Sequence, residues 1–164
     1  MNIRQMLFSD MSAVWSVQCD CYQGVLEPES LASLEAKRSA SPDSCFVAMD
    51  AGMVVGYLIS VPWLFGQVPS LNDAVCHIPQ DADCLYLHDM AISPKMAGMG
   101  MGKALFQAYQ AQTSAMGFSK MALTAVGEAE GFWRKIGFKV KQIVLSEAKV
   151  ADYGGQVTYM YQDC

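Results

Sequence analysis

The chain has 164 residues, a formal net charge of -5 and a pI of about 4.8, so residues 1–164 suffice for a single domain with a sizeable core. The acidic balance argues against nucleic acid as a partner, because nucleic-acid binding needs a basic surface. The longest apolar run, Met53–Phe65, is too short to span a membrane and is interrupted by glycine and proline. Met1–Gln5 lacks the apolar core of a signal peptide, so we expect a cytoplasmic protein that contacts no membrane.

The cysteines predict neither a disulfide framework nor a metal centre. With no secretory signal we expect free thiols, several of which fill the core. Cys76, His77, Cys84 and His88 could be assembled into a metal site, but their spacing is not diagnostic of one, and we expect no metal. The six cysteines are Cys19, Cys21, Cys45, Cys76, Cys84 and Cys164.

The first half of the chain predicts one strand, two helices and a hairpin. Apolar residues from Met11 onward recur at helical spacing, and Ser9 or Asp10 can cap that helix. A second helix is expected after Pro28, and 50–52 reads as a hairpin turn. The expected elements are a strand at 2–7, helices at 11–24 and 28–38, and hairpin strands at 45–49 and 53–60.

Residues 61–83 form a long irregular segment in the sequence. Connections of this length without secondary structure are often functional. The segment either shapes a ligand pocket or packs as a surface loop anchored by Trp63 and Phe65.

The second half of the chain alternates strands and helices. A helix is expected to end at Gly117 and a shorter one at Gly137, since glycine commonly follows the last helical turn. A turn is expected at Gly154–Gly155. The expected elements are strands at 85–92, 120–126, 138–145 and 157–161, helices at 100–116 and 129–136, and a loop at 148–155.

The turn between the strand at 85–92 and the helix that follows it has the parts of an anion site. Gly98, Gly100 and Gly102 let the backbone approach a ligand, and the first N–H groups of a helix have no internal partner. A P-loop is excluded because Ala97 replaces its first glycine and Ala104 its hydroxyl residue. A dinucleotide fingerprint also fails, because the glycine spacing is wrong.

The turn resembles the coenzyme A loop of the GNAT-type N-acetyltransferases, Gln/Arg-x-x-Gly-x-Gly/Ala. Gly100 and Gly102 match this pattern and Gly98 matches a common extra glycine, whereas Ala97 stands where Gln or Arg is usual. Lys95 could match the Gln or Arg only in a register two residues earlier, with Gly98 and Gly100.

A second segment, 129–138, resembles the family's Ala-x-x-Phe-Tyr-x-x-x-Gly-Phe motif at about the right distance downstream. Ala129, Phe132, Gly137 and Phe138 match it, and Trp133 replaces the usual Tyr. A third position departs from the family, because Val126 stands where Asn is frequent.

The resemblance covers nearly the whole chain and implies the fold and the cosubstrate. We expect an α/β (α+β) domain with a mixed, mostly antiparallel sheet of six to seven strands flanked by about four helices. The implied activity is transfer of an acetyl group from acetyl-coenzyme A to a primary amine of a small molecule or peptide. The residues expected to bind coenzyme A are Met90, Ala91, Ile92, Ala97, Gly98, Met99, Gly100, Met101, Gly102, Lys103, Ala104, Phe132 and Trp133.

The general base and acid are less well defined. His88 stands where the family often has Glu, with Asp89 beside it, and we expect only one of the two to face the pocket because strand residues alternate. An imidazole, with an ordinary pKa of about 6.5, suits a base at neutral pH, so the histidine is the candidate, unless it is a satisfied, half-buried residue. Trp133 is no practical acid, so either none is needed or Tyr86, Tyr153 or Tyr159 serves.

Two alternatives to the acetyltransferase remain at this stage. Ala97, Val126 and Trp133 favour a catalytically weak module of the same fold that binds an acyl-coenzyme A or a partner protein. A dinucleotide-dependent oxidoreductase is disfavoured by the glycine spacing. The negative charge would suit a cationic amine, and the apolar strand at 157–161 would allow a homodimer.

Overall fold

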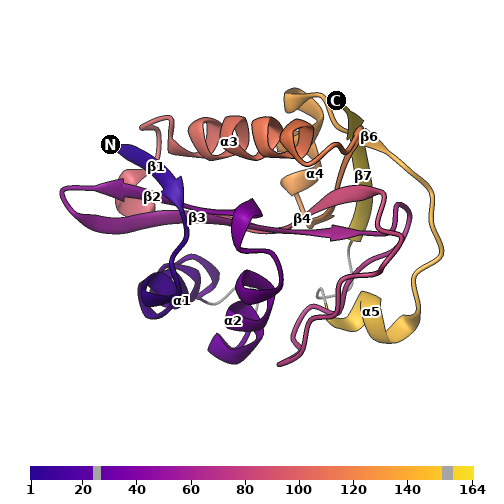
Figure 1. The fold of residues 1–164 in the computed structure, drawn as a ribbon, viewed down its shortest axis with the longest axis horizontal. Coiled ribbons are helices and arrows are strands. Elements are labelled where there is room, and N and C mark those ends of the chain that lie inside the picture. The colour runs from indigo at the N-terminus through magenta and orange to yellow at the C-terminus, as the bar shows by residue number, and fades with distance from the viewer. Residues whose placement is uncertain (24–26, 153–156) are drawn as a thin grey trace.

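The computed structural model describes residues 1–23, 27–152 and 157–164, and its centre is a seven-stranded sheet (Figure 1). The strand order is β1-β2-β3-β4-β5-β7-β6, and only β4 and β5 are parallel. This mixed, mostly antiparallel sheet confirms the expected fold. The strands are β1 (Asn2–Gln5), β2 (Cys45–Asp50), β3 (Met53–Trp63), β4 (Cys84–Ile92), β5 (Lys120–Val126), β6 (Lys139–Val140) and β7 (Val157–Asp163).

Helices cover both faces of the sheet. Figure 1 shows α1 (Met11–Tyr22) and α2 (Leu31–Ala40) on one face, and α3 (Met101–Ala115) with α4 (Ala129–Ile136) on the other. A fifth α-helix, α5 (Glu147–Asp152), lies beside the end of the sheet. The described ranges thus contain one α-helix more than the four expected.

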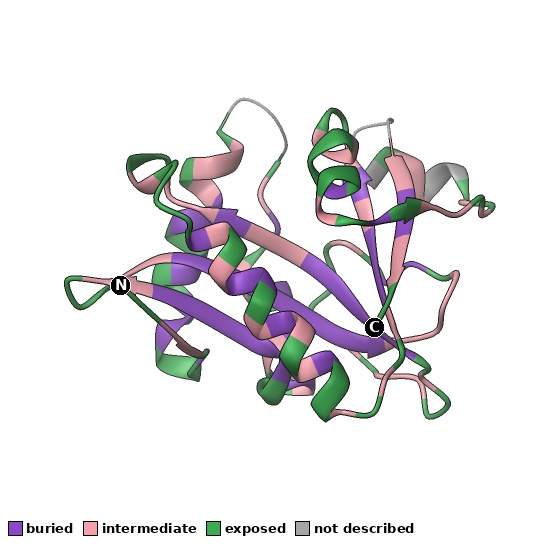
Figure 2. Cartoon of the chain, turned by 90° about the horizontal axis from the view of Figure 1, so that it is seen from above, coloured by how far each residue is buried: buried purple, intermediate pink, exposed green. Residues whose placement is uncertain are grey.

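The core is divided by the sheet into layers. One layer, which includes Leu58 and Leu105, packs between the sheet and α3 with α4, and the other, which includes Val14 and Leu34, packs under α1 and α2. Figure 2 shows the buried residues concentrated along the central strands. Each fully buried apolar side chain contributes about 1.5–3 kcal/mol, so the sheet holds the helices on either side firmly in place.

The ends of the first two helices use their polar residues differently. Ser30 caps α2, because its side chain accepts the Ser33 N–H at 3.1 Å. Asp10 occupies the N-cap of α1 as expected, but its carboxylate makes no cap bond to the helix and instead binds Arg4 at 2.7 Å. Gly24, where α1 was expected to end, lies outside the described residues.

Two expectations for the C-terminal third are wrong. The strand expected at 138–145 is limited to Lys139–Val140, because Ile143 and Leu145 bury their side chains against a cluster around Tyr159 rather than continuing the ladder. The loop expected at 148–155 contains α5, whose start is supported by the Ser146 hydroxyl accepting the Lys149 N–H at 3.2 Å. The turn expected at Gly154–Gly155 lies outside the described residues.

The long irregular segment is shorter than expected, since β3 continues to Trp63. Trp63 and Phe65 pack against the cluster around Tyr159, which agrees with their expected role as anchors. Leu71, from the same segment, lines the cavity described below. The segment therefore both packs against the sheet and shapes a pocket.

Candidate active site

A cavity of about 300 Å³ lies where β4 and β5 separate. The two strands pair only along Leu85–Leu87 and Met121–Leu123, and the cavity is bounded by the residues that follow on each strand. Parallel strands that diverge in mid-sheet leave backbone edges unpaired, which is a natural place for a ligand. The lining comprises Gln18, Tyr22, Glu27, Glu29, Leu71, Leu87, His88, Asp89, Met90, Leu123, Thr124, Ala125, Val126, Ala129 and Trp133.

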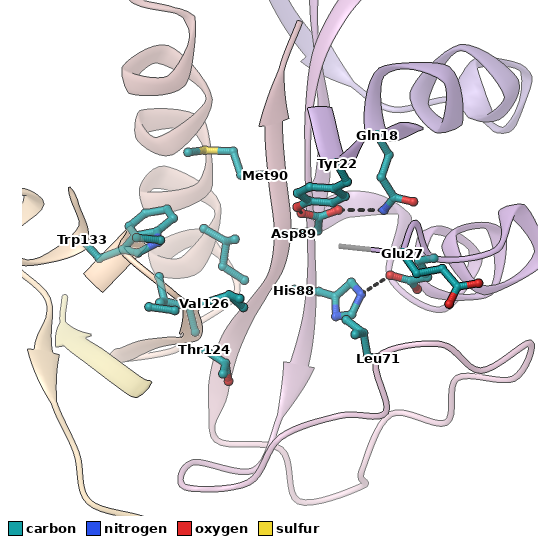
Figure 3. Close-up of a pocket in the computed structure, with 15 residues that line it drawn as sticks. Gln18, Tyr22, Glu27, Leu71, His88, Asp89, Met90, Thr124, Val126 and Trp133 are labelled. Atoms are coloured by element: carbon teal, nitrogen blue, oxygen red, sulfur yellow. Dashed lines mark hydrogen bonds and ion pairs between the residues drawn. The ribbon is translucent and has the colours of Figure 1, made fainter. Parts of the chain in front are cut away.

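The two sides of β4 give the cavity two different walls. Met90 and Trp133 lie on one side of the strand, and both belong to the apolar layer under α3 and α4 (Figure 3). Gln18, Tyr22 and Asp89 lie on the other side, towards α1 and α2. The cavity thus joins an apolar wall to a polar one through the opening in the sheet.

The glycine turn before α3 presents free backbone donors. Gly98 and Gly100 both have φ of 80°, a left-handed conformation that glycine adopts without strain. The first bond into α3 runs from the Ala104 N–H to the Gly100 carbonyl at 3.1 Å. Within the described residues, the N–H groups of Gly98 and of residues 100–103 have no protein acceptor. Successive free N–H groups at a helix start fit a pyrophosphate.

The expected pantetheine strand is held from one edge only. Met90, Ala91 and Ile92 pair with Leu58, Tyr57 and Gly56 of β3, and none of the three pairs with β5. Gly56 eases the close approach of the two strands, because a Cβ there would lie 3.1 Å from the Ala91 carbonyl oxygen and 2.6 Å from the Ile92 Cδ1 atom. The edge that faces β5 is therefore free to pair with an extended ligand.

His88 and Asp89 both line the cavity, so the expectation that only one of them would face it is wrong. Ile59 pairs with Asp89 and Ser60 pairs with Leu87, which leaves His88 as an extra residue in β4. Such a bulge interrupts the alternation of side chains. Both side chains consequently project towards α1 and α2.

His88 belongs to a buried charge network that the sequence did not reveal. Its Nε2 atom lies 2.6 Å from the Glu29 Oε1 atom, and the Lys37 Nζ atom lies 2.6 Å from the Glu29 Oε2 atom. Ser33 also donates to Glu29, and Lys37 is further held by the Leu71 carbonyl at 3.2 Å. The His88 side chain is 0 % exposed, and among the described residues its Nδ1 atom has no hydrogen-bond partner.

Two opposing effects act on Glu29. Burial by itself would raise the pKa of this carboxyl, but the charges and hydrogen bonds of His88 and Lys37 outweigh it and lower the pKa. Glu29 is therefore a carboxylate at neutral pH and can only accept hydrogen bonds. Consequently the His88 Nε2 atom carries the proton, and in the neutral ring the lone pair is on Nδ1.

Asp89 is surrounded by neutral donors. Gln18 donates through Nε2 at 3.0 Å, Tyr57 donates through its hydroxyl at 2.5 Å, and Tyr22 donates as well. These partners come from α1 and β3, and Asp89 itself lies on β4, so three separate elements meet at this carboxylate. The amide of Gln18 is oriented by its bond to Asp89, which leaves the Gln18 Oε1 atom buried without a donor.

Neither of the described tyrosines named as acids lines the cavity. The Tyr86 hydroxyl pairs with Thr124 at 2.7 Å, and the Tyr159 hydroxyl accepts the Gly66 N–H at 2.8 Å. Tyr153 lies outside the described residues. Trp133 is 8 % exposed and packs edge-on against Phe132 and Phe138, so it is a packing residue of the apolar wall.

The other candidate residues are dispersed. Lys95 and Lys103 are exposed beside the glycine turn, and Phe132 is half exposed on α4. All six cysteines are free thiols. In the part of the chain that the structure describes, no three His, Cys, Asp or Glu side chains group as metal ligands, and no helix is long and apolar enough to cross a membrane.

Sequence reasoning missed the residues that surround His88 and Asp89. Gln18 and Tyr22 lie at helical spacing with Met11 and Val14, and polar residues in an otherwise apolar pattern are the available signal. Glu29 and Tyr57 carry no such signal, because their partners His88 and Asp89 come from distant positions in the chain.

Comparison with known proteins identifies the class. The model of the acetyltransferase (GNAT) family matches residues 11–138, so this chain belongs to that family. No curated protein sequence matches the chain significantly.

Solved structures share the fold at low sequence identity. The loading GNATL domain of CurA from Lyngbya majuscula has a TM-score of 0.80 at 13% identity, covering 99% of this chain and 96% of that one. The GNAT-like decarboxylase GphF, in complex with isobutyryl-CoA, has a TM-score of 0.77 at 16% identity and covers 99% of both chains. A GNAT family acetyltransferase from Brucella melitensis, in complex with acetyl-CoA, has a TM-score of 0.62 at 21% identity, covering 96% of this chain and 94% of that one. At these identities the likeness concerns the fold.

Proposed function

We propose that the protein transfers an acetyl group from acetyl-coenzyme A to a primary amine of a small molecule or peptide. The observation that carries the proposal is the cavity between β4 and β5, which joins the unpaired edge of β4 at Met90 to a polar wall. Its volume of about 300 Å³ favours a small acceptor over a folded protein surface. A cytoplasmic location is part of the proposal.

The residues present fit the cosubstrate. The free N–H groups at Gly98 and residues 100–103 would hold its pyrophosphate, with Lys95 and Lys103 adding positive charge beside them. The unpaired edge of Met90–Ile92 would hold the pantetheine arm, and Trp133 would line its path. When bound, acetyl-coenzyme A supplies a thioester that is already activated towards amines.

The task of the polar wall is to deprotonate the acceptor. A typical primary amine has a pKa of about 10.4, so it enters mostly as ammonium. His88 Nδ1 carries the lone pair that would accept this proton, and the Glu29 carboxylate holds the ring in that tautomer through Nε2. The Met90 N–H would stabilise the charge that develops on the carbonyl oxygen.

No protein acid is required for the leaving group. A thiolate, whose conjugate thiol has a pKa of about 8.5, departs readily without protonation. The packing of Trp133 and the positions of Tyr86 and Tyr159 outside the cavity lining agree with a mechanism that lacks an acid.

The first test is titration calorimetry with acetyl-coenzyme A and, as a matched control, with NAD. We expect saturable binding of acetyl-coenzyme A alone, followed by release of free thiol in a screen of primary amines. If the protein fails to bind acetyl-coenzyme A, the proposal is wrong.

The second test is His88→Gln, which removes the base and keeps a polar group of similar size. We expect the maximal rate to fall by about 100-fold or more with unchanged binding of acetyl-coenzyme A. Retained binding in calorimetry shows that the variant is folded. An unchanged rate with an unchanged pH profile would exclude His88 as the base.

The alternative is an acyl-coenzyme A-binding or protein-interaction module with little turnover. Ala97 and Val126 depart from the family pattern, and the His88 Nδ1 atom is shielded from water. This reading predicts tight binding of acetyl-coenzyme A without thiol release for any amine.

A homodimer through β7 also remains a prediction, which size-exclusion chromatography can check.

A further inference from the structure

In the part of the chain that the structure describes, the Asp89 carboxylate is not paired with a cation. Its three partners, Gln18, Tyr22 and Tyr57, are all neutral donors. None of the ion pairs in the described ranges involves Asp89. A half-buried carboxylate without a cation is costly unless a bound ligand neutralises it.

The neighbouring phenols respond to that charge. Burial, reinforced by the nearby Asp89 charge, raises the pKa of Tyr22 and of Tyr57 well above the usual value of a phenol. Both tyrosines are therefore neutral at physiological pH and act only as donors or acceptors of hydrogen bonds. Neither tyrosine can therefore neutralise Asp89, and a bound ligand would have to supply the positive charge.

Gln18 adds a second unsatisfied acceptor to the same wall. Its side chain is buried, with only 1 % of the residue exposed, and lines the cavity. Because Asp89 can only accept, the Gln18 Nε2 atom must point to it, and the Oε1 atom is left without a donor. A buried acceptor without a partner beside an unpaired carboxylate matches a ligand with several N–H donors.

The other acidic residues of the lining disfavour an anion. Glu29 is already neutralised by Lys37, and Glu27 adds an exposed carboxylate to the polar wall. Among the described residues that line the cavity there is no lysine or arginine. A carboxylate on the acceptor would therefore meet negative charge without a cationic partner.

We propose that the acceptor is a small amine whose only charge is positive, and that its ammonium group binds at Asp89 and Gln18. The inference rests on the proposed function and narrows its substrate class, because it excludes amino acids and other carboxylate-bearing amines. Asp89 acts as the counter-ion of the ammonium group, and the proton leaves to His88 before the nitrogen attacks the thioester carbon.

The test compares amines that differ only by a carboxylate, namely cadaverine with lysine and tyramine with tyrosine. Binding of each is measured by calorimetry in the presence of coenzyme A, so that the result does not depend on turnover. We expect the decarboxylated member of at least one pair to bind about 10- to 100-fold more tightly. Equal or tighter binding of the amino acids, or no binding of any of the four, would overturn the inference.

Variants of Asp89 and Gln18 test whether these two side chains bind the amine. Asp89→Asn should weaken binding of the preferred amine about 10- to 100-fold and leave acetyl-coenzyme A binding unchanged. Asp20→Asn is the matched control, because it removes an exposed charge from α1 outside the cavity, and it should change neither. Gln18→Leu should weaken amine binding about fivefold. Unchanged amine binding in Asp89→Asn and Gln18→Leu would refute the assignment.

Turnover separates this inference from the proposed function. If the amines bind in the expected order but no thiol is released, the transferase proposal fails and the cation site stands. If thiol is released faster with lysine or tyrosine than with their decarboxylated partners, the transferase proposal stands and the substrate class is wrong.

Discussion

The glycine turn before α3 and the polar wall of the cavity are built in opposite ways. The turn is a single run of chain, 97–104, whose binding groups are backbone N–H groups. The polar wall is assembled from side chains of α1, β3, β4 and the segment that leads into α2. A site made by backbone depends mainly on conformation, whereas a site made by distant side chains depends on every element that contributes to it.

The difference shows in how each region tolerates departures from the family pattern. Ala97 and Met99 are exposed, so the turn keeps its shape whatever side chains these positions carry. In the wall, Glu29 is shared by His88, Ser33 and Lys37, so a change in any one of them alters the partners of the others. We expect substitutions in the wall to affect stability most and substitutions in the turn to affect coenzyme binding.

The largest effect is expected from Lys37→Ala, which removes the cationic partner of Glu29 in the wall. Removing one partner leaves the buried Glu29 carboxylate without its cation, which should lower the free energy of unfolding by about 3–5 kcal/mol. Urea denaturation measures this change. The control is Lys120→Ala, whose exposed pair with Asp163 should contribute little. Equal stability of the two variants would show that the wall is not a coupled unit.

In the turn, Gly100→Ala should have a smaller effect. A Cβ at Gly100 would meet no atom within 4 Å, so its cost is the left-handed conformation alone, about 1–2 kcal/mol. Calorimetry should show weaker acetyl-coenzyme A binding by about tenfold.

Gly131→Ala is the matched control for Gly100→Ala. Gly131 lies within α4 without a left-handed conformation, so alanine there should stabilise the protein by about 0.5–1 kcal/mol. If Gly100→Ala binds acetyl-coenzyme A as tightly as the wild type, the turn does not contribute to coenzyme binding.

Lowering the pH should destabilise the wild-type protein through the polar wall. The pKa of Glu29 is lowered in the folded protein from an ordinary value of 4.5, so the stability it contributes is present above pH 4.5 and is lost as the pH falls through the folded value. The difference in unfolding free energy between wild type and Glu29→Gln should therefore shrink on going from about pH 7 to about pH 3.5. A difference that stays constant across this range would contradict the ionised state of Glu29.

The smallest effect is expected from Lys103→Ala. Lys103 is exposed beside the free N–H groups, so its charge should contribute less than about 1 kcal/mol to phosphate binding. The apparent dissociation constant for acetyl-coenzyme A should rise a few-fold, and the rise should be larger at low salt than at high salt. Lys139→Ala, an exposed lysine of β6, is the control. An unchanged constant would remove Lys103 from the site.

Local patterns in the sequence determined most of the fold and the glycine turn before α3. Hairpin, helix and strand periods predicted the order of elements from β1 to α4, and three spaced glycines predicted the turn, because these features depend on neighbouring residues. The family resemblance in 97–104 and 129–138 is confirmed by the family match over 11–138. The strand predicted at 138–145 is limited to Lys139–Val140 in the structure, because Ile143 and Leu145 pack outside the sheet.

Only the tertiary structure decided the polar wall. The extra residue in β4 turned His88 and Asp89 to the same side, although strict alternation would have separated them. Glu29, which is 59 residues from His88 in the chain, became its partner, and Gln18, 71 residues from Asp89, was brought to that carboxylate. Charge pairing in a cavity depends on which side chains the fold brings together, and neither residue type nor spacing along the chain specifies that.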